Sequence, residues 1–175
     1  RCPYLPLFSS AYSRGEARGS AVGGWDFRRA GAGNDIGLGG AGGDTMTAGA
    51  GDDLVIGDNG QIDWTAAGVF KQFQTIGDAQ GGVDTINVGD GNNVVLGGEG
   101  GDAITTGTGS DLIVGDNGSI LYSGATVGNV IVKMESTDTV DQPTWGDTIR
   151  AGDGANRDGA GGGAARGDGG RGGGG

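Results

Sequence analysis

Residues 30–56 read AGAGNDIGLGGAGGDTMTAGAGDDLVI, which divides without a gap into three nine-residue units. In each unit an aspartate stands at the sixth place, directly after a glycine-rich stretch. A second run, residues 79–114, reads AQGGVDTINVGDGNNVVLGGEGGDAITTGTGSDLIV and repeats the pattern four more times, with Asn93 at one of the sixth places. A fixed short period of this kind predicts a solenoid, in which each repeat stacks on its neighbours.

Each nine-residue unit predicts a tight turn followed by a short strand. Glycine at the first, second and fourth places permits the positive φ angles that tight turns need. The eighth place is mostly apolar, whereas the seventh and ninth are mostly polar or variable, which predicts a strand of about three residues with one side chain inward. Because two units return the chain to its starting side, residues about 18 apart are expected to stack at the strand spacing of roughly 4.8 Å.

Stacking of this kind brings the sixth-place side chains close together. The predicted stacked pairs are Asp35 with Asp53, Asp84 with Asp102, and Asn93 with Asp111. Carboxylates at strand spacing repel each other unless a cation lies between them, and carboxylate and carbonyl oxygens are the ligands that calcium prefers. Softer metals are disfavoured because the chain has no histidine and a single cysteine. The predicted Ca²⁺ ligands are Asp35, Asp44, Asp53, Asp84, Asn93, Asp102, Asp111 and Asp147.

The pattern G-G-x-G-x-D-x-U-x, clearest in residues 39–56 and 79–114, resembles the RTX, or haemolysin-type, calcium-binding repeat. Residues 142–150 match its second half only. The resemblance implies a parallel β-roll with calcium ions aligned in its turns, in a secreted, extracellular protein. The expected fold class is therefore all-β: a parallel β-roll (β-solenoid) with two β-hairpin insertions and glycine-rich ends.

Two insertions interrupt the repeats, at about 61–78 and 119–141. Both are interpreted as β-hairpins because short β-branched and aromatic runs flank a turn. A longer repeat also exists, since IGDNGQIDW at 56–64 recurs as VGDNGSILY at 114–122. We expect the insertions to lie on one edge of the roll, either as a binding face or as a cover for an open side. The expected organisation is an N-terminal extension over 1–20, the β-roll over 21–158 and a glycine-rich tail over 159–175.

Charge and composition exclude several classes of function. Residues 30–149 carry 17 acidic side chains against two lysines, which argues for cation-dependent folding and against nucleic-acid binding. No run of about 18 apolar residues exists to insert into a membrane. The absence of histidine excludes Ser-His-Asp, Cys-His and HExxH sites, and there is no GxSxG motif, so we expect a chain that is not an enzyme.

Three kinds of function remain. The first is a calcium-dependent extracellular structural module, up to a self-associating fibre or surface-layer subunit. The second is a carrier module of a secreted RTX enzyme or adhesin whose active domain lies outside this chain. The third is a ligand- or ice-binding surface on the roll. The lack of a catalytic constellation favours the first, and all nine arginines flank an acidic body, which favours self-association into a homopolymer.

Overall fold

The structure is a computed structural model of the 175-residue chain, and it describes residues 14–17, 27–77, 81–125, 127, 130–137, 146–159 and 166–167. All regular secondary structure in these residues is β-strand, which confirms the all-β class. The same ranges contain no helix that is long and apolar enough to cross a membrane. The predicted N-terminal extension and glycine tail lie mostly outside the described residues.

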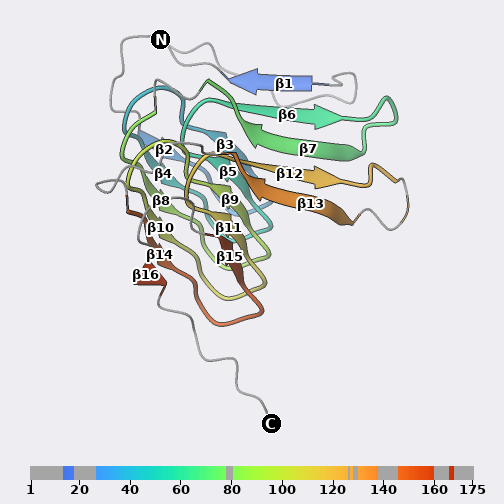
Figure 1. Ribbon diagram of the computed structural model, residues 1–175. Helices are drawn as coiled ribbons and strands as arrows, with labels where there is room; N and C mark the ends of the chain where they lie inside the picture. Colours follow the sequence, from blue (N-terminus) through green and yellow to red (C-terminus); the bar gives the residue numbers. More distant parts are fainter. Residues whose placement is uncertain are drawn as a thin grey trace.

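The strands of the nine-residue units alternate along the chain between two parallel sheets (Figure 1). The outer parallel sheet runs in the order β16-β14-β10-β8-β4-β2, and the inner parallel sheet in the order β15-β11-β9-β5-β3. The outer strands are β2 (Phe27–Arg29), β4 (Thr45–Thr47), β8 (Thr85–Asn87), β10 (Ala103–Thr105), β14 (Thr148–Arg150) and β16 (Arg166–Gly167). The inner strands are β3 (Ile36–Leu38), β5 (Leu54–Ile56), β9 (Val94–Leu96), β11 (Leu112–Val114) and β15 (Arg157–Gly159).

The register of both parallel sheets follows the predicted coil of two units. Ile86 lies beside Ile104 in the outer sheet, and Val95 lies beside Ile113 in the inner sheet, each pair 18 residues apart. Across the first insertion the stack continues unbroken, because Met46 lies beside Ile86 in the same sheet. The chain therefore leaves the stack to form the insertion and returns to the next position in register.

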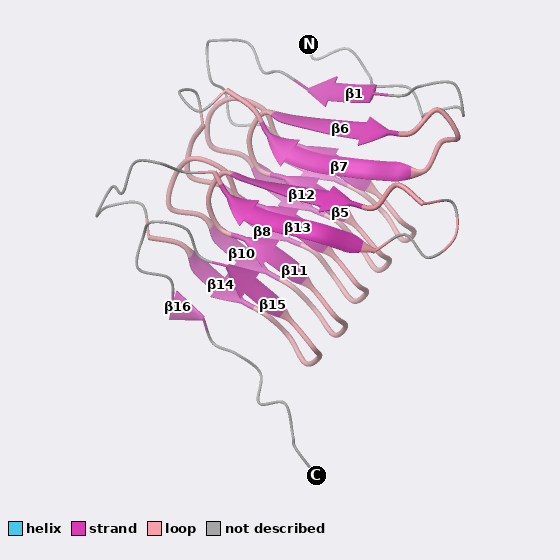
Figure 2. Ribbon diagram, turned by 45° about the vertical axis from the view of Figure 1, so that its right-hand side comes forward, coloured by secondary structure: helices cyan, strands magenta, loops and turns pink. Residues whose placement is uncertain are grey.

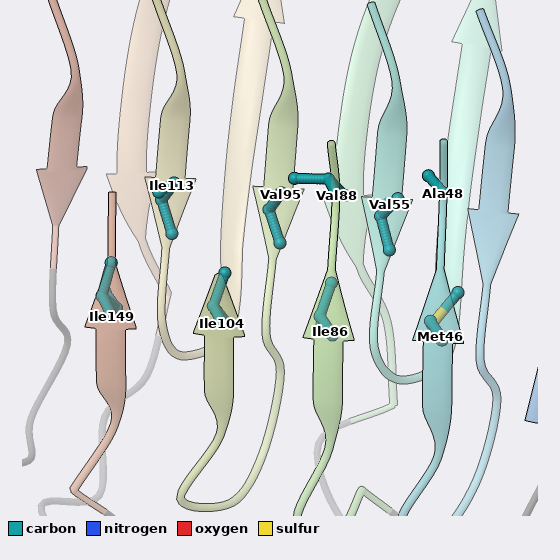
Figure 3. Close-up of a cluster of buried hydrophobic side chains, with 9 residues drawn as sticks. All are labelled: Met46, Ala48, Val55, Ile86, Val88, Val95, Ile104, Ile113 and Ile149. Carbon is teal, nitrogen blue, oxygen red and sulfur yellow. The ribbon is translucent and has the colours of Figure 1, made fainter. Parts of the chain in front are cut away.

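A first hydrophobic core lies between the two parallel sheets, and it is built from eighth places together with Ala48 and Val88, which are first places (Figure 3). Its residues are Met46, Ala48, Val55, Ile86, Val88, Val95, Ile104, Ile113 and Ile149, each at most 8% exposed. The inward direction of the eighth place is thus confirmed. Gly37 occupies one eighth place without leaving a void, because the Met46 Cε lies 2.8 Å from where a Cβ of Gly37 would be. The flexible methionine fills the space that glycine leaves.

The two insertions, together with β1 from the N-terminal part of the chain, form a third, antiparallel sheet in the order β1-β6-β7-β12-β13, which lies in front of the inner sheet (Figure 2). Its strands are β1 (Arg14–Ala17), β6 (Gly60–Trp64), β7 (Phe70–Thr75), β12 (Gly118–Tyr122) and β13 (Ile131–Ser136). Strands β6 and β7 pair antiparallel, as do β12 and β13, so both insertions are hairpins. The hairpins do not lie on one edge of the roll, which corrects that part of the expectation. They cover a face of the inner sheet, as the alternative of a cover for an open side predicted.

A second hydrophobic core lies between the inner sheet and this antiparallel sheet. It contains Leu38, Ile56, Ile62, Phe73, Leu96, Leu112, Val114 and Ile120. In β3, β5, β9 and β11 the seventh and ninth places are therefore apolar, and all of them except Ile36 pack against the hairpins. This corrects the expectation of polar or variable residues there. In the outer sheet those places stay mostly exposed, for example at Thr85 and Asn87. Only the sheet that receives a covering layer carries apolar residues on both faces.

We predict that Phe73→Ala lowers the stability of the calcium-loaded chain by about 3–5 kcal/mol, because a fully buried aromatic ring joins the two layers. The measurement is urea unfolding in calcium. The control is Val83→Ala, whose side chain is 62% exposed, with an expected change within about 0.5 kcal/mol. Equal midpoints for the two variants would mean that the hairpin layer does not stabilise the roll.

Candidate metal centre

The sixth-place side chains form two columns, one along the turns that lead into each parallel sheet. The outer column contains Asp44, Asp84, Asp102 and Asp147, which precede strands of the outer sheet. The inner column contains Asp35, Asp53, Asn93, Asp111 and Asn156, which precede strands of the inner sheet. All eight predicted ligand residues fall in these columns, and Asn156 joins them. Asp102 and Asp111 belong to different columns, although their repeats are adjacent in sequence.

Backbone-to-side-chain hydrogen bonds join each column into a ladder. In the outer column the Oδ1 of Asp84 accepts the Asp44 N–H at 2.7 Å, and Asp102 Oδ1 accepts the Asp84 N–H at 2.8 Å. The Asp102 N–H in turn donates to Asp147 Oδ1 at 2.8 Å. Bonds to a carboxylate are stronger than neutral ones, so each step ties one coil to the next. The predicted Asp84–Asp102 pair is one step of this ladder.

The inner column repeats the arrangement. Asp53 Oδ1 accepts the Asp35 N–H at 2.9 Å, Asn93 Oδ1 accepts the Asp53 N–H at 3.0 Å, and Asp111 Oδ1 accepts the Asn93 N–H at 3.0 Å. Asn156 Oδ1 ends the series by accepting the Asp111 N–H at 3.0 Å. The predicted pairs Asp35–Asp53 and Asn93–Asp111 are both present. The steps that bridge an insertion, such as Asp53 to Asn93, were not predicted.

The second carboxylate oxygens have no comparable partner. The Oδ2 atoms of Asp35, Asp53, Asp84, Asp102, Asp111 and Asp147 are buried without a hydrogen bond. An unsatisfied buried polar atom costs about 1–3 kcal/mol, and more when it is charged. Several such atoms in regular columns therefore require protons or a bound cation.

Glycine backbone lines the space beside these oxygens in the outer column. A Cβ placed on Gly97 would lie 2.4 Å from Asp102 Oδ2 and 1.9 Å from the Gly115 carbonyl oxygen. A Cβ on Gly57 would lie 2.0 Å from Asp84 Oδ2 and 2.4 Å from the Gly97 carbonyl oxygen. Carboxylate and carbonyl oxygens thus face the same small space, which is open only because the residue is glycine. Such an all-oxygen set fits calcium.

The asparagines of the inner column act as an internal comparison. Asn93 Nδ2 donates to the carbonyl oxygens of Gly89 at 3.1 Å and Gly91 at 3.3 Å, and Asn156 Nδ2 donates to the Gly152 carbonyl at 2.7 Å. The carbonyls of the turn therefore point at the second atom of the sixth-place side chain. In an aspartate turn that second atom is an oxygen, which cannot donate. A bound cation would supply there the positive charge that the amide N–H supplies at Asn93.

Burial makes these carboxylates hard to ionise without a cation. Desolvation raises the pKa of Asp102 to about 9, with smaller contributions from Asp84, Asp147 and Asp58. Desolvation likewise raises the pKa of Asp84 to about 7, with Asp44 adding to the effect. Desolvation is also the largest cause of the raised pKa values of Asp53 and Asp147.

Two buried aspartates at the start of the insertions were not among the predicted ligands. Asp58 is 4% exposed and Asp116 is 2% exposed. Asp58 Oδ1 accepts the Gly82 N–H at 3.2 Å and its Oδ2 accepts the Glu99 N–H at 2.5 Å, so its carboxylate joins two neighbouring turns. Desolvation raises its pKa to about 8, and the nearby Asp84 adds to this. The recurring GDNG at 57–60 and 115–118 was the available signal for both residues.

Within the described ranges no three histidine, cysteine or acidic side chains converge in a metal-binding group. The oxygens that would hold a cation in the outer column are instead mixed, since Asp84 and Asp102 Oδ2 lie beside glycine carbonyls. Calcium takes six to eight oxygens, about 2.3–2.6 Å away, and accepts such mixed sets. The residues present therefore fit calcium better than a softer metal.

Calcium-free protein is predicted to be more stable at about pH 5 than at about pH 9, because the folded pKa values of Asp84, Asp58 and Asp102 are raised above the unfolded value of 3.8. A raised carboxyl pKa means that the folded state binds the proton more tightly. Stability is then full below the unfolded pKa and falls as the pH passes through about 7, 8 and 9. Because the chelated chain is expected to be a coil at neutral pH, the measurement is the TMAO concentration that restores half of its β spectrum at each pH. This concentration is expected to rise with pH, and one that falls as the pH rises contradicts the sign.

The Asp102→Asn variant is predicted to bind fewer calcium ions and to be more stable than the parent by about 1–3 kcal/mol in chelator, because an amide N–H replaces an unsatisfied oxygen. The number of calcium ions bound in calcium buffer measures the first effect, and the TMAO concentration that restores half of the β spectrum in chelator measures the second. Asn93→Asp is the reverse control and should lower stability in chelator. A chelated Asp102→Asn protein that is less stable than the parent would show that Oδ2 does not require a positive partner.

The model of the RTX calcium-binding nonapeptide repeat matches four copies in this chain, over residues 29–61, 78–113 and 96–119. No characterised protein and no solved structure gave a significant match. The matched ranges contain most of both aspartate columns and the glycine turns beside them. Residues 29–61 and 78–119 therefore carry RTX calcium-binding nonapeptide repeats.

Proposed function

We propose that this chain is a calcium-dependent, non-catalytic structural module of an extracellular protein, folded as a parallel β-roll with its calcium ions in the two columns of turns. The observation that carries the proposal is the set of buried, unpartnered Oδ2 atoms, repeated in register from coil to coil. A catalytic carboxylate is usually one of a few side chains in a cleft, whereas these recur in register along both columns.

Calcium binding is proposed to be coupled to folding. The described turns bring together carboxylates that are far apart in the unfolded chain, for example Asp44 and Asp84, whose ladder bond spans 40 residues. A site that exists only in the folded state adds its binding free energy to folding. The 17 acidic side chains of residues 30–149, against two lysines, add a repulsion that bound cations relieve.

An extracellular location suits this dependence. Extracellular calcium modules bind with dissociation constants of about 10⁻⁴–10⁻³ M, so they stay loaded outside the cell and empty in the cytosol. Proteins with RTX repeats are typically secreted, which supports the same location. The chain would then be synthesised in a calcium-poor compartment as a coil and fold on release.

A structural role is favoured over catalysis by the chemistry that is present. The sequence contains no histidine to act as a general base. The buried sixth-place carboxylates are already engaged through Oδ1 in holding neighbouring coils together. We include end-to-end association of copies in this proposal, because open strand edges at the ends of a solenoid recruit further strands.

The decisive experiment is circular dichroism of the chain in chelator and in calcium. We expect a coil spectrum in chelator and a β spectrum after calcium addition, with magnesium as the matched control that does not restore it. Magnesium is too small and too rigid in geometry for a mixed carbonyl and carboxylate set. An unchanged β spectrum in excess chelator at neutral pH would remove calcium-coupled folding from the proposed function.

A further inference from the structure

The two hairpins are structural copies of each other. Ile62 lies opposite Phe73 in the first hairpin, and Ile120 lies opposite Met134 in the second. Both hairpins carry a register shift at the equivalent place, after Asp63 in one and after Leu121 in the other. By this alignment β13 in the second hairpin is the equivalent of β7 in the first.

From the first hairpin to the second, each of the three sheets grows by the same number of strands along the stack. Between one hairpin and the next, the chain adds two strands to each parallel sheet and two strands to the antiparallel sheet. Strands in all three sheets have the same spacing of about 4.8 Å, so the three layers stay in step. The inner and antiparallel sheets accordingly contain five strands each, from β3 to β15 and from β1 to β13 (Figure 2).

The outer edges of β7 and β13 differ in what covers them. β12 pairs with β7, with Ile120 opposite Phe73, and both side chains are 0% exposed. No strand among the described residues pairs with the outer edge of β13. Val130, Ile131 and Val132, in and beside this strand, are 58%, 41% and 56% exposed. An edge strand with exposed apolar residues is a template for a further strand.

We propose that the outer edge of β13 is the docking edge for a second copy of this chain, whose β1 strand lies beside it and adds one parallel pair to the sheet that β1, β6, β7, β12 and β13 form. The proposal rests on the proposed function, since only the calcium-folded chain presents this edge. If a second copy is displaced along the stack by the height of five strands, its β1 lies beside β13 and, at the same time, its β3 lies beside β15. β1 and β13 run parallel, because each is antiparallel to an equivalent strand, β6 or β12.

The same count of strands excludes direct pairing of β6 of the second copy with β13. That pairing requires a displacement of only four strands, and β3 of the second copy would then lie at the height that β15 already occupies. β1 is therefore the strand that fits between the two hairpin layers. The contact continues the spacing already present inside the chain rather than creating a new one.

The charges of the two ends are complementary. In the sequence, residues 1–29, which include β1, contain five arginines and two acidic residues. Residues 130–175, which include β13, contain five basic and seven acidic residues. Opposite net charges attract the two ends and orient the encounter, and salt screens this attraction beyond about 10 Å at 0.1 M.

In the outer sheet, β16 pairs with β14 and occupies the place that β2 of the second copy would take. Docking of a copy therefore displaces β16. This gives the contact a signature that a nonspecific aggregate lacks: the amides of Arg166 and Gly167 lose protection from exchange while those of β13 gain it.

The test is sedimentation velocity of the full-length chain in calcium at low salt, compared for the parent, Val132→Lys and Val83→Lys. Val83 is a matched control because it is 62% exposed, against 56% for Val132, and lies outside the proposed contact. We expect the parent and Val83→Lys to form larger species that dissociate as salt is raised, and Val132→Lys to remain monomeric. Circular dichroism in calcium on each sample confirms that the variants fold.

Hydrogen exchange of the parent chain provides a measurement that needs no substitution. The proposal requires slower exchange in β1 and β13 and faster exchange in β16 when the protein concentration is raised. A calcium-folded parent that stays monomeric overturns the docking edge and leaves calcium-dependent folding intact. Equal association of the two lysine variants, or assembly without a change in β13, also overturns it.

Discussion

The fold depends on one repeated interaction, in which a sixth-place side chain accepts the backbone N–H of its counterpart in the neighbouring coil through Oδ1. This bond, seen from Asp44 to Asp147 and from Asp35 to Asn156, fixes the coil spacing at the turns. It also fixes the direction of the second oxygen, which is left buried beside glycine carbonyls. The bond that aligns the coils thus creates the places that require a cation. Structure and calcium binding cannot be separated, because one carboxylate serves both.

Glycine is required where the coils approach most closely. A Cβ on Gly154 would lie 1.5 Å from the Gly109 carbonyl oxygen, and both residues have positive φ angles, of 152° and 143°. Strands of about three residues bury only one side chain each between the parallel sheets, so this core is thin. The hairpin layer compensates by burying larger residues, such as Phe73, on the other face of the inner sheet. The apolar area that the repeats cannot supply comes from the insertions.

Much of the stack follows from the period of the sequence, and the rest depends on contacts that no period encodes. The sixth and eighth places predicted the ladder pairs and the first core, because turn and strand geometry are local. The apolar residues at the seventh and ninth places of the inner sheet, such as Leu38 and Leu96, are explained by the third sheet that covers them, and the nine-residue period does not predict that sheet. Asn93 fitted the ligand pattern by position, yet its amide donates to two glycine carbonyls. Asp58 was missed because its partners, Gly82 and Glu99, lie in turns distant in sequence.

The placement of the hairpins follows from strand spacing. A hairpin is two strands wide, about 9–10 Å, which equals the height of two coils. A hairpin at every turn into the outer sheet would need twice the height that the roll provides, and the added strands would crowd or splay. Residues 39–44 and 97–102 connect an inner strand directly to the next outer strand, and these short connections alternate with the two that contain hairpins. One hairpin for every two coils therefore fits the height of the stack. The longer repeat in the sequence is therefore the shortest interval at which a two-stranded insertion can recur while all three sheets remain in register.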